Sequence, residues 1–223
     1  MIQKVKANRI VLWLHPSDIG LPLPAQLCKL QRKGLEIRYY PKGIRSYTKL
    51  IPAIEQYPDD VIITIDDDVM YDRNTLYDLI RTYKETSDTV CGLRCHRMKL
   101  NADGGLLPYT EWEWDDKMQD TEPDEYIFPT GVGGVLYPPG ALGVEALNSE
   151  AFMSICPTAD DVWFKWMTRR NHILSRKCIR THTFGFKQRN IANTAETPLS
   201  DDNVNGGKND IQIRRMLEKY GWQ

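Results

Sequence analysis

The sequence predicts an α/β fold in which a mostly parallel central sheet is flanked by helices. Apolar β-branched runs alternate with segments of helical periodicity through the first part of the chain, and turn residues separate them. Strands that alternate with helices in this order are typical of a parallel sheet, because each helix carries the chain back to the starting edge of the next strand. At 223 residues, the length fits a single domain that spans residues 1–223.

Four strands are expected from the apolar runs. Ile10–Leu14 is followed by polar and turn residues, and Leu35–Tyr40 alternates apolar with polar residues, as a strand with one buried face does. Val61–Ile65 is β-branched throughout, which is typical of a buried strand. Val90–Arg94 is the fourth.

Helices are expected between and after these strands, over residues 24–33, 46–56, 74–86, 158–170 and 210–220. Gly34 closes the first helix, since glycine readily takes the left-handed conformation that ends helices. In the third helix, Leu76, Leu79, Ile80 and Tyr83 recur at helical spacing and form one apolar face. The sequence thus predicts an amphipathic helix directly after the strand Val61–Ile65.

Polar residues set the expected ends of the last two helices. Thr158 and Asp161 have the spacing of a capping box, and Asn209 or Asp210 is expected to begin the helix over residues 210–220. Residues 187–209 are polar with little periodicity and are expected to form a flexible loop.

Composition excludes several classes of protein. The chain has 29 basic and 30 acidic residues and a net charge of −1, so overall charge gives no attraction to nucleic acid. Its five cysteines are odd in number and scattered, which indicates free thiols in a reducing compartment. We find neither a signal peptide nor an apolar run of ~20 residues. These features predict a cytoplasmic protein without a transmembrane segment and leave peripheral association with a membrane open.

The most informative feature is the acidic run Asp66-Asp67-Asp68 at the end of the third strand. Because a strand interior cannot hold three unpaired anions cheaply, we expect these acids where the strand opens into a loop. That edge of an α/β sheet is where ligands bind. Clustered carboxylates there suit Mg²⁺ or Mn²⁺, which prefer oxygen ligands. The alternative is that the acids stabilise the N-terminus of the next helix.

The acidic run, together with the order of three further segments, resembles the "DXD" motif region of nucleotide-sugar-dependent glycosyltransferases with the GT-A fold. The resemblance is to the family 2-like enzymes of bacterial surface polysaccharide synthesis and covers roughly residues 8–185. It rests on residues 62–68, 44–53, 131–137 and 159–163. One departure concerns the start of the chain, since Asn8–Trp13 lies where the second strand of the family pattern begins. The usual first strand-helix unit, part of the nucleotide pocket in this family, has no counterpart in this sequence.

The resemblance implies a metal-assisted transfer of a sugar from a nucleotide-sugar donor, a UDP-sugar first of all, to a saccharide or lipid-linked acceptor. It implies Mn²⁺ or Mg²⁺ as cofactor, with Asp66, Asp68 and His182 as metal ligands. Asp161, or its neighbour Asp160, is the implied catalytic base. An inverting displacement follows from that assignment by analogy with the family.

On the donor side, the resemblance and the local charge together suggest six nucleotide-sugar-binding residues: Arg45, Lys49, Asp66, Asp67, Gly133 and Gly134. Arg45 and Lys49 supply positive charge for a diphosphate, and the two glycines would let the backbone approach a sugar. Because adjacent residues of an extended backbone face opposite ways, Asp67 is expected to point away from its two neighbours.

Three other functions are weighed against this one. A phosphatase needs Asp66 and Asp68 in a frame that continues with Thr or Val, but Met70 stands at that position. A sugar nucleotidyltransferase shares the chemistry of metal and diphosphate, but we see no glycine-rich basic segment near the first strand. The third alternative is a catalytically impaired, transferase-like protein that binds saccharides or serves as a scaffold. Metal-dependent binding of a nucleotide distinguishes the enzymes from the scaffold.

Overall fold

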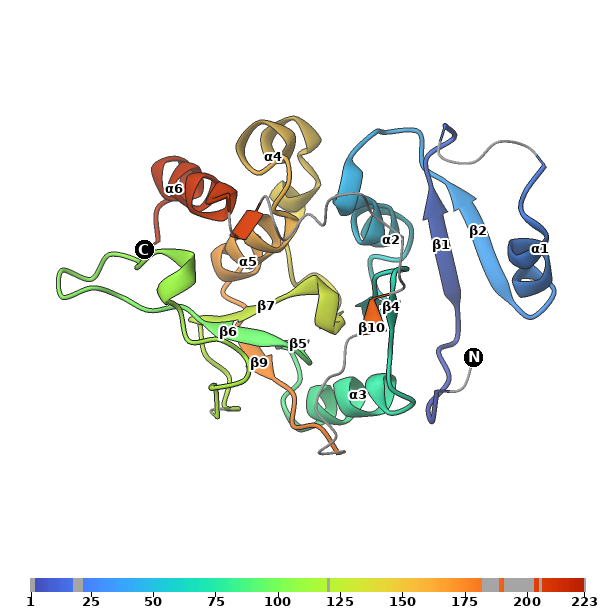
Figure 1. Ribbon diagram of the computed structural model, residues 1–223, viewed down its shortest axis with the longest axis horizontal. Coiled ribbons are helices and arrows are strands. Elements are labelled where there is room, and N and C mark those ends of the chain that lie inside the picture. The colour runs from blue at the N-terminus through green and yellow to red at the C-terminus, as the bar shows by residue number, and fades with distance from the viewer. Residues whose placement is uncertain are drawn as a thin grey trace.

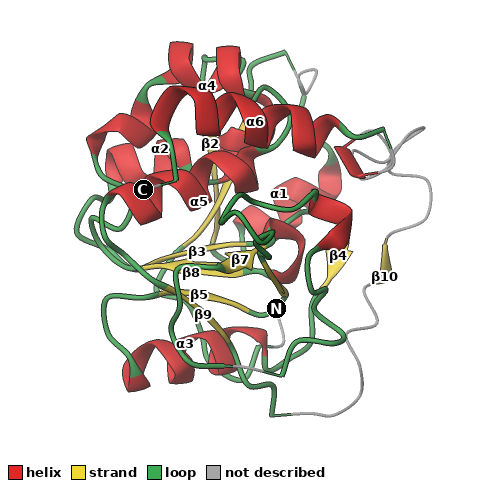
Figure 2. Cartoon of the chain, turned by 90° about the vertical axis from the view of Figure 1, so that its left-hand side faces the viewer, coloured by secondary structure: helices red, strands yellow, loops and turns green. Residues whose placement is uncertain are grey.

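The computed structural model describes residues 3–17, 22–119, 121–181, 189–190, 203–204 and 206–222. Its central feature is a four-stranded sheet in the order β3 (Ile62–Thr64), β8 (Val135–Tyr137), β5 (Val90–Gly92) and β9 (Ser175–Lys177). Helix α3 (Thr75–Glu85) lies on one side of the sheet, as Figure 2 shows. The opposite side carries α2 (Ile51–Gln56), α4 (Ser149–Ile155), α5 (Asp160–Arg170) and α6 (Lys208–Tyr220). The chain is therefore a mixed α/β protein with the sheet between two helical layers.

The expectation of a mostly parallel central sheet is wrong. Strand β8 runs antiparallel to both β3 and β5, and within this sheet only the β5–β9 pair is parallel. The prediction assumed that β3 and β5 are parallel neighbours joined by a helical crossover. Strand β8, which follows the 3₁₀ turn η3 (Gly131–Gly133) and was not predicted, lies between them instead. All three residues of β8 are buried, so this antiparallel strand lies in the middle of the sheet.

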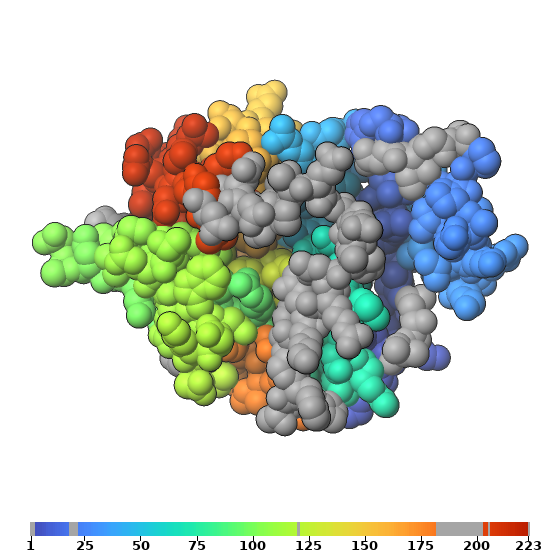
Figure 3. Space-filling view, in the orientation of Figure 1, coloured from blue at the N-terminus to red at the C-terminus, as the bar shows by residue number. Residues whose placement is uncertain are grey.

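The first part of the chain forms a small sheet of its own. Strands β1 (Ile10–Leu14) and β2 (Leu35–Tyr39) are parallel, with Ile10 opposite Leu35, and α1 (Ala25–Gln31) connects them. This unit lies at the opposite end of the molecule from α6 (Figures 1 and 3). Helix α1 ends at Gln31 with Arg32 as its C-cap, two residues before the predicted end, and Gly34 follows with a left-handed φ of 99°. No residue of β1 or β2 is fully buried, so the expected buried face of the second strand is incomplete.

The remaining strands are short. Strand β6 (Cys95–Arg97) pairs with β7 (Ile127–Pro129), and β4 (Val69–Met70) pairs with β10 (Arg189–Asn190), both antiparallel. The pairing of β10 places one described part of the expected loop 187–209 beside the chain that follows Asp68. Two 3₁₀ turns complete the regular structure, η2 (Tyr109–Glu111) and η4 (Val144–Leu147).

The core lies on both faces of the sheet because successive residues of a strand point to opposite sides. Val135 and Tyr137 of β8 belong to the large core cluster, which also includes Trp163 of α5. Leu136 of β8 packs with Leu79 in the smaller cluster on the α3 side. All five cysteines are free thiols, as their number and spacing predicted. Cys91, Cys95, Cys156 and Cys178 are buried, and Cys28 is partly exposed.

Several helix ends differ from the predictions. The expected helix 46–56 is two pieces, the 3₁₀ turn η1 (Arg45–Lys49) and α2, which join at Leu50. The capping box is wrong: α5 has no side-chain cap, and the Thr158 hydroxyl donates to Asn203 Oδ1. Helix α6 begins at Lys208, after Gly207 with a φ of 68°. For α5 a tertiary contact replaces the local signal, and for α6 a left-handed glycine does.

Strand β3 is shorter and more exposed than its β-branched sequence predicts. It covers only Ile62–Thr64, and the flanking Val61 and Ile65 are 42% and 47% exposed. Among the described residues, we find no helix with the length and apolar character needed to cross a bilayer.

A buried hydrogen bond connects η1 to the end of α4. The Tyr47 side chain is fully buried and its hydroxyl donates to the carbonyl oxygen of Cys156 at 2.6 Å. We expect Tyr47→Phe to lower the free energy of unfolding by about 1–3 kcal/mol, because the buried carbonyl loses its partner. Denaturant titration measures this change. Tyr39→Phe is the matched control, since Tyr39 is 47% exposed and its loss of a hydroxyl should change stability by less than about 0.5 kcal/mol.

Candidate functional site

Four segments that are distant in sequence meet around the side chain of Lys49. Lys49 is the last residue of η1, Asp66 follows the end of β3, and Asp160 is the first residue of α5. The ammonium nitrogen Nζ of Lys49 lies 3.2 Å from Asp66 Oδ1 and 3.1 Å from Asp160 Oδ2. Lys49 thus joins the acidic run to the second acidic pair through two ion pairs.

These ion pairs are largely screened from water. The side chains of Lys49, Asp66 and Asp160 are 20%, 24% and 10% exposed. Charges this far from water must be paired, because desolvation is costly for each of them. Burial alone would lower the pKa of Lys49, but the nearby charges of Asp160, Asp161 and Asp66 outweigh it and hold that pKa well above its ordinary value. Lys49 is therefore a permanent cation at this site.

Asp161 is held by the backbone of the glycine-rich segment. The N–H of Gly131 donates to both carboxylate oxygens of Asp161, at 3.1 and 3.0 Å. A β-carbon at position 131 would lie 2.6 Å from Lys49 Nζ and 3.0 Å from Asp161 Oδ1. A side chain at this position would require Lys49 or Asp161 to move, so Gly131 is a site residue that our sequence prediction missed. Its signal was the run Gly131–Gly134, of which only the last two glycines were assigned.

The environment of Asp161 favours its protonated form. Burial raises the pKa of Asp161 to about 7, the charge of Asp160 adds to the increase, and Lys49 and the Gly131 N–H oppose it. A carboxylate at a helix N-terminus ordinarily has a lowered pKa, but at Asp161 burial outweighs the effect of the helix end. Asp161 nevertheless keeps partial access to solvent, which a base that meets a substrate requires.

The acidic run lies where it was expected. Asp66 lies two residues after the end of β3, and Asp67 and Asp68 form the turn that leads into β4. The Asp66 N–H donates to the hydroxyl of Tyr71 at 2.8 Å, and this hydroxyl donates to the carbonyl of Val132 at 3.1 Å. Tyr71 therefore fixes the acidic turn to the glycine-rich segment. The sequence offered no signal for this residue.

Asp66 and Asp68 are the carboxylates that fit a hard divalent cation. Among the described residues, no three acidic, histidine or cysteine side chains gather into one metal-binding group. A Mg²⁺ or Mn²⁺ ion that shares its coordination sphere with water and substrate phosphates needs only one or two carboxylates. Asp68 is half-buried and has no ion pair within the described part of the chain, and Asp66 has a second oxygen beyond the one at Lys49. His182, the third expected ligand, lies outside the described residues.

The four remaining residues that were predicted to bind the donor are Arg45, Asp67, Gly133 and Gly134. Arg45 is exposed, with a left-handed φ of 54°, and forms no ion pair with another described residue. Asp67 is exposed in the acidic turn. A β-carbon at Gly133 would lie 2.5 Å from the Arg94 β-carbon, and Gly134 has a φ of 88°. The chain's own packing at Gly133 and its backbone conformation at Gly134 therefore already favour glycine, and binding of a sugar by these residues stays a prediction.

Buried tyrosines surround the acidic pair. Tyr47, Tyr109 and Tyr137 are each at most 7% exposed. Burial raises the pKa of each of them, and the charge of Asp161 adds to the effect in all three cases. These hydroxyls stay neutral at physiological pH, whereas Asp161 titrates in this range.

The raised pKa of Asp161 has a consequence for stability. A carboxyl whose folded pKa of about 7 exceeds the ordinary 3.8 stabilises the fold at low pH and loses this contribution as the pH rises through the folded value. We expect Asp161→Asn to be more stable than the wild type at pH 8, by about 2–4 kcal/mol, with a difference that shrinks from pH 7 to pH 4. Denaturant titration across pH measures it.

The matched control is Asp59→Asn, which changes an exposed aspartate outside the site. We expect its stability to follow that of the wild type at each pH, within about 0.5 kcal/mol. If Asp161→Asn also follows the wild type, the buried carboxyl does not titrate as described.

Comparison with known proteins adds no assignment to this geometry. No protein-family model matches the sequence, and no curated protein matches it. The functional interpretation therefore rests on the residues and contacts of the chain itself.

Proposed function

We propose that this chain is a nucleotide-sugar-dependent glycosyltransferase of the GT-A type, which transfers a sugar from a nucleotide diphosphate donor to a hydroxyl of a saccharide or lipid-linked acceptor. A UDP-sugar is the proposed donor. The proposal joins the sequence resemblance to one observation, the convergence of Asp66, Lys49, Gly131 and the pair Asp160-Asp161. All of these except Gly131 are residues on which the sequence analysis placed the chemistry, and together they come from four separate segments.

Asp161 is the proposed general base. A base that works near neutral pH is most effective when its own pKa is near neutral, and burial raises the pKa of Asp161 to about 7. Its neighbour Asp160 is less suited, because it is 7% exposed and its Oδ2 is paired with Lys49. In the proposed step, Asp161 takes the proton of the acceptor hydroxyl as the acceptor oxygen bonds to the anomeric carbon and the bond to the diphosphate breaks.

Asp66 and Asp68 would hold the divalent cation. When bound, such a cation neutralises the charge that develops on the leaving diphosphate. Asp68 is the better placed of the two to change its contacts on binding, since its carboxylate has no ion pair with a described residue, whereas Asp66 is anchored by Lys49 and by its own N–H to Tyr71.

The proposed role of Lys49 differs from simple diphosphate binding. Its ammonium already has two carboxylate partners at 3.1–3.2 Å, so its main effect is to hold Asp66 and Asp160 in fixed positions and reduce their mutual repulsion. A preorganised set of charges requires little rearrangement when the transition state forms.

Nucleotide binding tests the metal assignment. We expect wild-type protein to bind UDP in a manner that depends on Mn²⁺, and Asp68→Ala to lose that dependence, because one of two carboxylate ligands is gone. Isothermal titration calorimetry with UDP, with and without Mn²⁺, measures both properties. The control is Asp59→Ala, an exposed aspartate before β3, which should bind like the wild type. Equal metal dependence in Asp68→Ala would refute the assignment.

Turnover tests the base. We expect Asp161→Asn to lower kcat by ~10²–10⁴-fold while the donor KM changes little, because the amide cannot accept the proton. The assay measures release of the nucleotide diphosphate in the presence of saccharide acceptors. Near-normal turnover in this variant together with loss in Asp160→Asn would move the role to Asp160.

A further inference from the structure

Arg94 is a half-buried arginine beside the glycine-rich segment, and no acid of the described residues lies within ion-pair distance of it. Its Nη1 donates to the hydroxyl oxygen of Thr130 at 2.9 Å, and this hydroxyl donates to the Arg94 carbonyl at 3.2 Å. A guanidinium has five N–H donors. In the described part of the chain only one of them has an acceptor, and the others remain accessible to solvent. Arg94 therefore has donors available for an anion.

Short contacts connect Arg94 to the proposed base. Thr130, which accepts from Arg94, is followed directly by Gly131, and the Gly131 N–H donates to both carboxylate oxygens of Asp161 at 3.1 and 3.0 Å. The charges of Arg94 and Asp161 also act on the same buried hydroxyl, since Asp161 raises the pKa of Tyr109 and Arg94 lowers it. The guanidinium and the carboxylate are thus close enough for one saccharide to contact both.

An aromatic ring lies next to this guanidinium. The guanidinium carbon of Arg94 is 5.9 Å from the centroid of the Trp114 ring, within the distance of a cation–π contact. Trp114 is partly exposed, and its ring packs against His96 and Tyr109, with centroids 4.7 and 6.0 Å apart. Burial lowers the pKa of His96 to about 3, so this support for the indole is uncharged at neutral pH. Ligand sites combine aromatic side chains with a few well-placed polar groups in this way.

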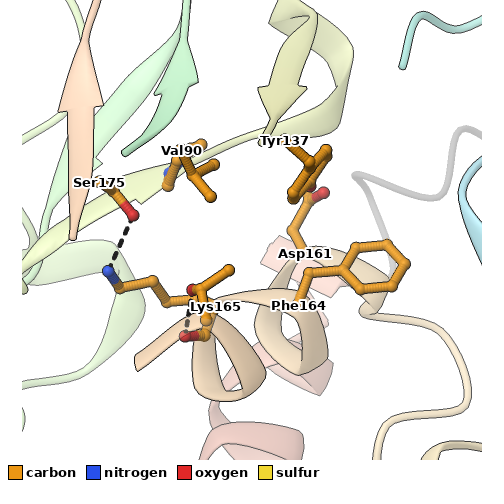
Figure 4. Close-up of a pocket in the computed structure, with 8 residues that line it drawn as sticks. Val90, Tyr137, Asp161, Phe164, Lys165 and Ser175 are labelled. Carbon is orange, nitrogen blue, oxygen red and sulfur yellow. Dashed lines mark hydrogen bonds between the residues drawn. The ribbon is translucent and has the colours of Figure 1, made fainter. Parts of the chain in front are cut away.

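The space behind Asp161 is too small for a substrate. Figure 4 shows the pocket on whose wall Asp161 lies, together with Tyr137 and Phe164. Its volume is about 10 Å³, room for about one water molecule. An acceptor therefore has to reach the Asp161 carboxylate from outside this pocket. Neither Arg94 nor Trp114 lines the pocket, and both are partly exposed, so they remain available to such an acceptor.

We propose that Arg94 and Trp114 form the acceptor subsite, and that the acceptor is an acidic saccharide whose carboxylate or phosphate binds Arg94. The inference deepens the proposed function and rests on it, since it names the class of substrate that Asp161 deprotonates. A guanidinium binds either oxyanion through two parallel hydrogen bonds. The ring of the sugar lies against Trp114, and one of its hydroxyls meets Asp161.

Two other roles for Arg94 are open to test. The first is a purely structural tie between the chain before β6 and Thr130, which would not distinguish charged from neutral sugars. The second is binding of the donor's diphosphate, which would make the affinity for UDP depend on Arg94. Binding measurements with small sugars separate both roles from the acceptor subsite.

The indole N–H signal of Trp114 in NMR spectra reports binding at this subsite. The chain has six tryptophans, and the signal is identified by its loss in Trp114→Phe. We expect D-glucuronate or D-glucose 6-phosphate to shift it with an affinity about tenfold or more above that of D-glucuronamide and D-glucose, because the neutral sugars lack the charge-assisted bonds to Arg94. The tighter of the two anions identifies the group. Equal affinities, or no shift with any of the four sugars, overturn the inference.

Arg94→Gln tests the residue itself, because it removes the charge and keeps an N–H donor for Thr130. We expect this variant to lose the preference for the acidic sugar. Arg170→Gln is the matched control: Arg170 is exposed on α5 and its guanidinium lies 4.6 Å from the centroid of the Tyr220 ring. It should keep the wild-type preference. An equal loss in both variants would indicate a general charge effect and overturn the role of Arg94.

Arg94→Lys decides the case in which Arg94→Gln does not fold. Lysine keeps the positive charge but not the paired donors of the guanidinium. We expect its affinity for the acidic sugar to fall while that for D-glucose stays the same. An unchanged affinity for the acidic sugar overturns the role of the guanidinium.

Two further ligands separate the subsite from other anion sites. If Arg94→Gln weakens binding of UDP with Mn²⁺ and leaves the acidic sugars unaffected, Arg94 belongs to the donor site and the inference is overturned. Inorganic phosphate that binds as tightly as D-glucose 6-phosphate overturns it as well, because the sugar ring then contributes nothing. All these titrations measure binding without turnover, whereas the kcat of Asp161→Asn decides the proposed function, so the two failures are distinguishable.

Discussion

The geometry of the candidate site depends on the ammonium group of Lys49. It lies between Asp66 and Asp160, two acids that would otherwise repel each other in a region with little water. This one cation joins the 3₁₀ turn before α2, the acidic turn after β3 and the first turn of α5. Gly131 is confined to glycine for the same reason, because its missing side chain leaves the space that Lys49 and Asp161 occupy. The ion pairs and the backbone N–H together fix four segments with respect to one another.

The sequence predicted most helices and strands but not how the strands pair. The local sequence was sufficient where a segment's own residues determine its secondary structure. The elements β1, β2, α1, α3 and α5 all lie close to the ranges that the sequence predicted. The antiparallel position of β8 was missed because the sequence of three residues after a glycine-rich turn does not indicate which strands they pair with. The capping box at Thr158 failed for a related reason, since its hydroxyl has a tertiary partner, Asn203, that local spacing cannot reveal.

The residues of the candidate site were likewise predicted only in part. The acids were found because three adjacent carboxylates at a strand end are chemically conspicuous, and their place in the turn before β4 is confirmed. The role of Lys49 as a partner of two acids was not found, because ion pairs between distant segments depend on tertiary structure. Tyr71 was missed on similar grounds, because a tyrosine after an acidic run differs from other tyrosines only through its hydrogen bonds in the folded chain.

The separation in sequence of the residues that meet at Lys49 has a consequence for folding. Contacts between distant segments form only after long loops have closed, and such closures are slow compared with local helix formation. The acidic turn and α5 can each acquire their local shape early, whereas the ion pair between Lys49 and Asp160 requires the chain from α2 to α5 to be in place. The site is therefore assembled only when the fold is complete. A chain that ends before α5 would contain the acids of the turn but would lack the ion pair between Lys49 and Asp160 that positions them.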